Sequence, residues 1–78
     1  MSIREAILKR LNELCAQKEI SISKFCLNAG LTPSTIYELG HGSTKCPKVI
    51  TLKVLCDGNG LTLSEFFDTD YFNSELEP

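Results

Sequence analysis

The sequence predicts a small all-α domain, and two observations support this prediction. Apolar residues recur at three- and four-residue intervals over several stretches, which places them on one face of a helix. No stretch alternates apolar and polar residues with the β-branched enrichment that is typical of a strand. With 78 residues, of which 42% are apolar and 23% charged, the chain has the size and composition of one globular domain with four or five short helices.

The first helix is predicted over residues 3–18. Ser2 and Glu5 have the spacing of a capping box, in which an N-cap serine is followed three residues later by glutamate. The residues after this signal form a stripe along one helix face, namely Ile3, Ile7, Leu11 and Leu14.

A second helix and a third follow closely. Ser21 is a favourable N-cap for the second helix, and Gly30 ends it because glycine takes a positive φ at low cost. Thr32 caps the third helix, and Pro33 suits its first position, where no N–H is needed. The inner face of the second helix is expected to hold Ile22, Phe25, Cys26 and Ala29, and that of the third Ile36 and Leu39.

Two further helices are predicted after a loop over residues 40–48. The fourth helix spans about residues 49–57, and residues 57–60 terminate it. Thr62 and Glu65 form a second capping box, which opens a short fifth helix through Phe67. The fourth helix is expected to contribute Ile50, Leu52, Leu55 and Cys56 to the core. The last ten residues show no clear period.

Residues 21–39 have the pattern of a helix-turn-helix unit. Two short helices that cross steeply over a short turn need a small residue at the crossing, here Cys26, and a residue tolerant of positive φ, here Gly30. Leu31 is expected to fill the corner. The outward positions of the third helix are then Pro33, Ser34, Thr35, Tyr37 and Glu38.

Over about residues 3–68 the chain resembles the helix-turn-helix family of lambdoid phage repressors and Cro proteins (XRE type). The resemblance rests on the step from Cys26 to Thr32, on residues 34–36, on Gly42, on residues 51–53 and on residues 61–67. It implies a compact five-helix, lambda-repressor-like DNA-binding domain over residues 1–68. Residues 69–78 would then be an acidic C-terminal tail or docking segment.

The resemblance also implies a function, which is transcriptional regulation, and specifically repression, by a homodimer on double-stranded operator DNA. Members of the family place the third helix in the major groove and the start of the second helix against the backbone. The residues implied for the groove are Thr32, Pro33, Ser34, Thr35, Tyr37 and Glu38. Those implied for phosphate contacts are Ser21 and Ile22 at the second helix, and His41, Ser43, Thr44, Lys45 and Lys48 in the following loop.

Two positions depart from the family pattern. Pro33 and Ile22 stand where members often carry side chains that form hydrogen bonds. Base readout therefore falls to Ser34, Thr35, Tyr37 and Glu38. Glu38 can accept a hydrogen bond from cytosine, but phosphates repel it. We therefore expect modest sequence specificity or recognition of DNA shape. The alternative is that Ser34 and Thr35 are ordinary first-turn residues and that Lys45 and Lys48 are ordinary solvated charges.

Charge is divided unequally along the chain, whose net charge is −2. Residues 1–56 hold all eight Lys and Arg and four acids, a balance of +4, whereas residues 57–78 hold six acids and no base. The first part can therefore offer a positive face to DNA. The acidic part motivates an alternative function, in which the same fold is a protein-interaction module.

Other function classes have weaker support. A single histidine without paired carboxylates, and the lack of a Gly-rich phosphate loop, argue against an enzyme, a cofactor or a small-molecule ligand. Since no apolar run is long enough for a membrane span and no signal-peptide pattern is present, we expect a cytoplasmic protein with reduced thiols. Cys15, Cys26, Cys46 and Cys56 lack zinc-site spacing, and most are expected to be buried, although a thiol or metal sensor remains an alternative. The apolar residues of segment 57–72 are the expected dimer surface.

Overall fold

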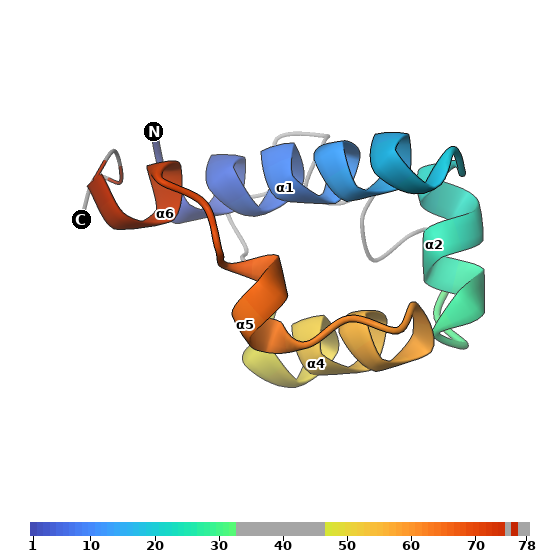
Figure 1. The fold of residues 1–78 in the computed structure, drawn as a ribbon. Coiled ribbons are helices and arrows are strands. Elements are labelled where there is room, and N and C mark those ends of the chain that lie inside the picture. The colour runs from blue at the N-terminus through green and yellow to red at the C-terminus, as the bar shows by residue number, and fades with distance from the viewer. Residues whose placement is uncertain (33–46, 75, 77–78) are drawn as a thin grey trace.

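The computed structural model describes residues 1–32, 47–74 and 76, and all regular elements in this part of the chain are helices. Helix α1 lies along one side of the molecule and α4 along the other, while α2 connects the two sides at one end (Figure 1). The predicted all-α class is confirmed, and the predicted third helix lies outside the described residues. The helices are α1 (Ile3–Lys18), α2 (Ile22–Asn28), α4 (Val49–Gly58), α5 (Leu63–Phe66) and α6 (Tyr71–Ser74).

Helix α1 has the predicted bounds and the predicted N-cap. The Ser2 hydroxyl accepts a hydrogen bond from the Glu5 backbone N–H at 3.2 Å and donates one to the Glu5 carboxylate at 3.1 Å. The helix ends at Glu19, which takes a left-handed conformation with φ of 56°. Ile3 was expected in the buried stripe, but it is 40% exposed because it lies in the first turn, at the edge of the core.

One hydrophobic core joins α1, α2, α4 and α5. Ile50 was predicted to belong to it, and this is wrong, since its side chain is 65% exposed. Successive helical residues are rotated by about 100°, so Ile50 faces away from the stripe that begins at Leu52. The buried members of the cluster are Ile7, Leu11, Leu14, Cys15, Phe25, Cys26, Leu52, Leu55, Cys56 and Phe66.

The turn after α2 has the predicted conformation. Gly30 adopts a φ of +72°, as expected for the residue that ends the helix. The Leu31 N–H then donates to the Cys26 carbonyl at 3.0 Å, and the Leu31 side chain packs against the core. The first helix and the turn of the predicted helix-turn-helix unit are thus present.

The C-terminal ends of α2 and α4 meet in backbone contact. A Cβ atom at Gly58 would lie 2.4 Å from the Ala29 Cα and 2.7 Å from the Asn28 carbonyl oxygen, so no side chain fits there. The sequence marked residues 57–60 as a helix stop, and Gly60 does adopt a φ of +71°. Glycine is thus required at Gly58 for a different reason from that at Gly60. At Gly58 the reason is the close packing of the two helices.

Asn59 holds the same two helices together from within. Asn59 is 9% exposed, and its side-chain amide N–H groups donate to the Phe25 carbonyl of α2 at 2.9 Å and to the Leu55 carbonyl of α4 at 2.8 Å. Its amide oxygen accepts a hydrogen bond from the Asn28 side chain at 2.9 Å. These bonds satisfy carbonyls that the helix ends leave open.

Helix α5 is fixed at both of its ends. Thr62 and Glu65 form the predicted capping box at its start, with both reciprocal hydrogen bonds present. At its end, the Arg10 guanidinium of α1 donates to the Phe66 carbonyl at 2.7 Å and to the Glu65 carbonyl at 2.8 Å. A cation at the carbonyl end of a helix is favourable, so Arg10 connects α1 to α5.

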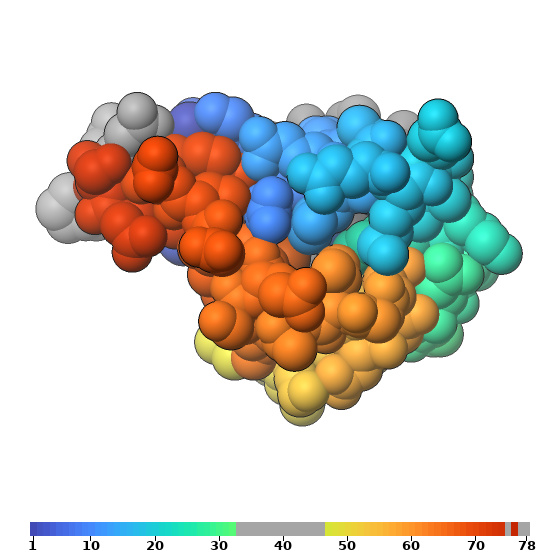
Figure 2. Space-filling view, viewed as in Figure 1, coloured from blue at the N-terminus to red at the C-terminus, as the bar shows by residue number. Residues whose placement is uncertain are grey.

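Helix α6, which the sequence did not predict, packs against α1 (Figure 2). Tyr71 is 8% exposed, its hydroxyl donates to the Glu13 carboxylate, and the Lys9 ammonium lies 4.4 Å from the centre of its ring. The Phe72 ring lies 4.9 Å from that of Phe67. The apolar residues of segment 57–72 therefore pack into or against the core and do not form an exposed surplus.

We predict that Gly58→Ala destabilises the fold by about 1–3 kcal/mol, because the new methyl group would overlap backbone atoms of α2. The free energy of unfolding, measured in urea, checks this. A glycine-to-alanine change in a helix ordinarily stabilises by roughly 0.5–1 kcal/mol, so a stabilised Gly58→Ala protein would contradict the close approach. Gly30→Ala is the matched control with open space around it, and its cost of about 1 kcal/mol reflects the positive φ alone.

A second prediction concerns alkaline pH. Burial, followed by the hydrogen bond and the charge of Glu13, raises the pKa of Tyr71 to about 12 from 10.0. Because the pKa is higher in the folded state, the stabilisation by the neutral phenol is complete below about pH 10 and is lost as the pH rises to about 12. We expect the free energy of unfolding to fall by up to about 2–3 kcal/mol over that range.

Unfolding of Tyr71→Phe in urea at a series of alkaline pH values tests whether Tyr71 causes this loss of stability. The variant should be less stable at neutral pH by about 1 kcal/mol, since it lacks the hydrogen bond, but its stability should fall less above pH ~10. Equal pH dependence in the wild type and Tyr71→Phe would refute the assignment to Tyr71.

Candidate nucleic-acid interface

The N-terminus of α2 is the first part of the predicted interface that the structure describes. Ser21 is exposed and acts as the N-cap, and its hydroxyl accepts a hydrogen bond from the Lys24 backbone N–H at 3.1 Å. The side chain of Ile22 is half-buried and packs against the core. Ile22 can therefore serve a phosphate only through its backbone N–H, one of the amides that a helix leaves without an internal partner.

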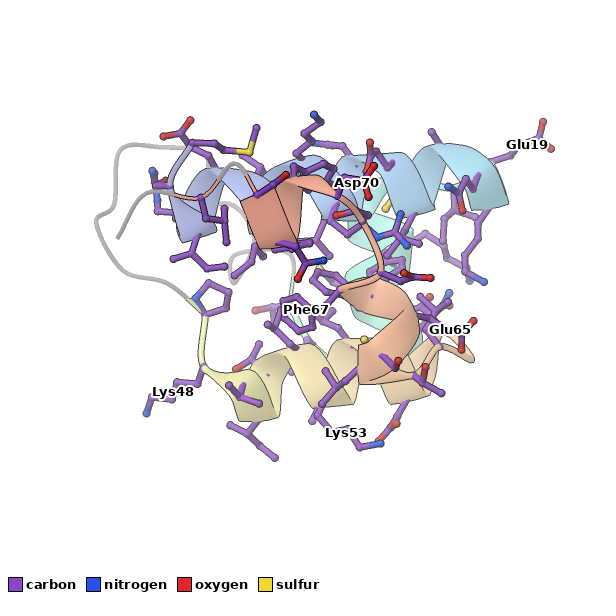
Figure 3. All side chains as sticks on the ribbon, turned by 60° about the vertical axis from the view of Figure 1, so that its left-hand side comes forward. Glu19, Lys48, Lys53, Glu65, Phe67 and Asp70 are labelled. Atoms are coloured by element: carbon purple, nitrogen blue, oxygen red, sulfur yellow. The ribbon has the colours of Figure 1, made fainter. Side chains whose placement is uncertain are left out.

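Two exposed lysines lie at the N-terminal ends of α4 and α2, and one of them, Lys48, is a predicted contact. Lys48 is the N-cap of α4, makes no side-chain capping hydrogen bond, and extends away from the body of the domain (Figure 3). Lys24, in the first turn of α2, is also exposed. The sequence interpretation did not name Lys24 as a contact, although a basic residue beside a predicted phosphate site was a usable signal.

Three of the other cations in the described residues make contacts within the domain. Arg10 is bound to α5, Lys9 lies over the Tyr71 ring, and Lys53 forms an ion pair with Asp57 at 2.6 Å. These contacts place three positive charges in intramolecular interactions. Lys24 and Lys48 are exposed, so their charges are accessible to a polyanion.

The structure describes four of the predicted contact residues. Ser21, Thr32 and Lys48 are exposed, and Ile22 is half-buried. Thr32 directly follows the turn at Leu31, where the predicted third helix would begin. The remaining predicted contacts lie outside the described residues; they are Pro33, Ser34, Thr35, Tyr37, Glu38, His41, Ser43, Thr44 and Lys45.

Comparison with known proteins identifies this arrangement. The family model of the Cro/C1-type HTH DNA-binding domain matches residues 10–70. The chain belongs to this family. Its fold is similar to that of prophage Lp1 protein 11 in a crystal structure, with a TM-score of 0.81 and 29% sequence identity over 95% of this chain and 99% of that one. Among curated proteins, no sequence matches the chain.

Membership of the Cro/C1-type family makes the protein a DNA-binding domain. The match includes the second half of α1, the turn at Gly30 and the α2–α4 junction, and it ends one residue before α6. The resemblance derived from the sequence is therefore confirmed. No helix in the described ranges is long and apolar enough to cross a membrane.

Three cysteines of this Cro/C1-type domain are core residues, as predicted. Cys15, Cys26 and Cys56 are free and buried, and burial raises the pKa of each thiol. Because the thiolate is the species that reacts and binds metals, a raised pKa makes these groups poor sensors. The described residues contain no group of His, Cys, Asp and Glu that is suited to a metal ion, and Cys46 lies outside them.

We predict that the thiols of a Cys46→Ser variant do not react with a thiol reagent while the domain is folded. The remaining Cys15, Cys26 and Cys56 are buried, so the reagent reaches them only after unfolding. Reaction with Ellman's reagent, with and without urea, measures this. Rapid reaction of any thiol in the folded variant would revive the sensor hypothesis.

Proposed function

We propose that this Cro/C1-type domain is a transcriptional repressor that binds operator DNA as a homodimer and reads it through a third helix at residues 33–39. The observation that carries the proposal is the preserved first half of the helix-turn-helix unit. Helix α2 begins with a serine cap and an exposed lysine, and it ends in a left-handed turn at Gly30. Such a unit places its second helix in the major groove while its first helix crosses the backbone.

Phosphate contacts supply most of the affinity in this proposal. The DNA phosphates are held by the N-terminal amides of α2 and by Lys24 and Lys48. In the sequence, Lys24 precedes the reading helix and Lys48 follows it. Base contacts come from Ser34, Thr35, Tyr37 and Glu38, and the exposed Thr32 precedes them at the start of the reading helix. Because these positions offer few bidentate donors, DNA shape contributes to the choice of site.

Repression requires only that the bound dimer occupies its operator and excludes other proteins from it. A domain that binds DNA without further chemistry is sufficient for this. Two acids of the stretch that begins at Asp57 make local contacts, since Asp57 pairs with Lys53 and Glu65 takes part in the capping box of α5.

Selection of binding sites from a random duplex pool, followed by fluorescence anisotropy on the selected duplex, tests the proposal. We expect Lys24→Ala and Lys48→Ala each to weaken binding several-fold and to reduce the salt slope by about 0.9, since each removes one phosphate contact. Lys53→Ala is the matched control on the α4 surface. Its charge is already paired with Asp57, so it should bind like the wild type.

Absence of salt-sensitive DNA binding by the wild type would refute the proposal. It would favour the alternative that this domain binds a protein partner. Selected sequences without inverted repeats would retain DNA binding but contradict the homodimer.

A further inference from the structure

Asn59 and Gly60 form the one Asn-Gly dipeptide of the sequence, and they directly follow α4, where its C-terminal end meets that of α2. The fold requires both residues. Asn59 supplies the side-chain amide that bonds to carbonyls of both helices, and Gly60 adopts a φ of +71°, which is favourable for glycine. Asparagine is a chemically labile residue, and it is most labile before glycine, which leaves its backbone nitrogen unhindered. The other asparagines, Asn12, Asn28 and Asn73, precede larger residues.

Deamidation of such a dipeptide proceeds in two steps. The Gly60 backbone nitrogen, after losing its proton, attacks the side-chain carbonyl carbon (Cγ) of Asn59. A carbon–nitrogen bond forms, the bond from Cγ to the side-chain nitrogen breaks, and ammonia leaves with the proton that the Gly60 nitrogen lost. Water then opens the resulting five-membered imide at one of its two carbonyls, which yields aspartate or isoaspartate. Water is the only co-reactant.

The folded domain holds the side chain of Asn59 away from this reaction. Its nitrogen, which would have to leave, donates to the Phe25 carbonyl at 2.9 Å and to the Leu55 carbonyl at 2.8 Å. Its oxygen accepts a hydrogen bond from the Asn28 side chain at 2.9 Å. Because α2 and α4 both bond to this buried amide, the amide can turn toward Gly60 only after these bonds break.

The backbone also turns the attacking nitrogen away. Asn59 has a ψ of 13°, so the Gly60 nitrogen nearly eclipses the Asn59 nitrogen and is rotated away from the Asn59 Cβ. Ring closure needs the Gly60 nitrogen on the side of Cβ. The Leu61 N–H, which donates to the Cys56 carbonyl at 2.8 Å, fixes the turn in its present form. Both reacting groups therefore become available only when this junction of α2 and α4 opens.

We propose that Asn59-Gly60 is a deamidation site that the fold keeps closed, so that it reacts with water in unfolded molecules and its products cannot rebuild the junction of α2 and α4. Unfolding, which is otherwise reversible, then becomes a permanent loss of folded chains. The rate of this loss is set by the unfolded fraction. The inference depends on the fold and is independent of the proposed repressor function.

The chemistry of the products explains why the loss is permanent. An ionised carboxylate only accepts hydrogen bonds, so it would present an oxygen to the Phe25 and Leu55 carbonyls in place of the amide donor. Burial of such an unpaired charge is strongly unfavourable. Isoaspartate also lengthens the main chain by an additional carbon, which displaces Gly60 from its turn. Both products therefore lose the link between α2 and α4.

Incubation of the wild-type chain at mildly alkaline pH, in buffer and in guanidinium chloride, tests whether the fold protects Asn59. Mass spectrometry of proteolytic peptides measures deamidation at each asparagine. In denaturant, Asn59 should react several-fold faster than the other three asparagines, and Gly60→Ala should abolish this difference. In buffer, the reaction of Asn59 should be slower by at least about a hundredfold, since a rate limited to unfolded molecules falls with their population.

Gly58→Ala tests the dependence on unfolding without denaturant. This variant is expected to be less stable, because the added methyl group overlaps backbone atoms of α2. In buffer, its Asn59 should deamidate faster than that of the wild type. The increase should equal the factor by which the unfolded population, measured in urea, is larger.

Asn59→Asp represents the aspartate product and tests the permanent loss. Urea unfolding followed by circular dichroism should show a variant that is unfolded in buffer or unfolds at a clearly lower urea concentration than the wild type. Asn12→Asp is the matched control, because Asn12 is exposed and its amide bonds to a carbonyl of its own helix. It makes the same change of charge and should unfold close to the wild type.

Three results would overturn the inference. Equal rates at Asn59 in buffer and in denaturant would show that the fold does not protect it. Equal rates at all asparagines in denaturant would show that Asn59-Gly60 is not a preferred site. An Asn59→Asp variant as stable as Asn12→Asp would show that the product can still fold. None of these results bears on DNA binding, which the experiments on the proposed function measure separately.

Discussion

The contact between the ends of α2 and α4 is the constraint on which the rest of the domain depends. Gly58 lets the two backbones approach to a distance that excludes a side chain, and the buried amide of Asn59 bonds to carbonyls of both helices. In a chain this short the hydrophobic core is small, so specific polar bonds at one junction have a large share in defining the helix arrangement.

This junction also positions the candidate interface. Ser21 and Lys24 lie at the start of α2, and Lys48 lies at the start of α4. Each helix therefore carries these residues at its N-terminal end and meets the other helix at its C-terminal end. A change in the crossing of α2 and α4 would therefore move the two lysines relative to each other. The polar network at Asn59 thus helps to fix the relative positions of Lys24 and Lys48, the two lysines proposed as phosphate contacts.

The acidic C-terminal part of the chain packs away from the candidate interface. Tyr71 and Phe72 hold it against α1 and α5, where Glu13 and Lys9 contact Tyr71. This arrangement keeps α6 beside α1, whereas Lys48 projects from the start of α4 (Figure 3). The exposed Lys48 therefore lies on a different element from the acidic C-terminal residues.

The sequence by itself determined four of the described helices, α1, α2, α4 and α5, because caps and periodicity are local signals. Ser2, Ser21 and Thr62 cap helices as predicted, and Gly30 forms the predicted left-handed turn. Tertiary structure alone decided which side chains meet across the chain. The requirement for glycine at Gly58, the bonds of Asn59, and the docking of α6 all join residues far apart in sequence, and no local pattern encodes such distances. The exposure of Ile50 has the same origin, since only the packed core shows which side of α4 it covers.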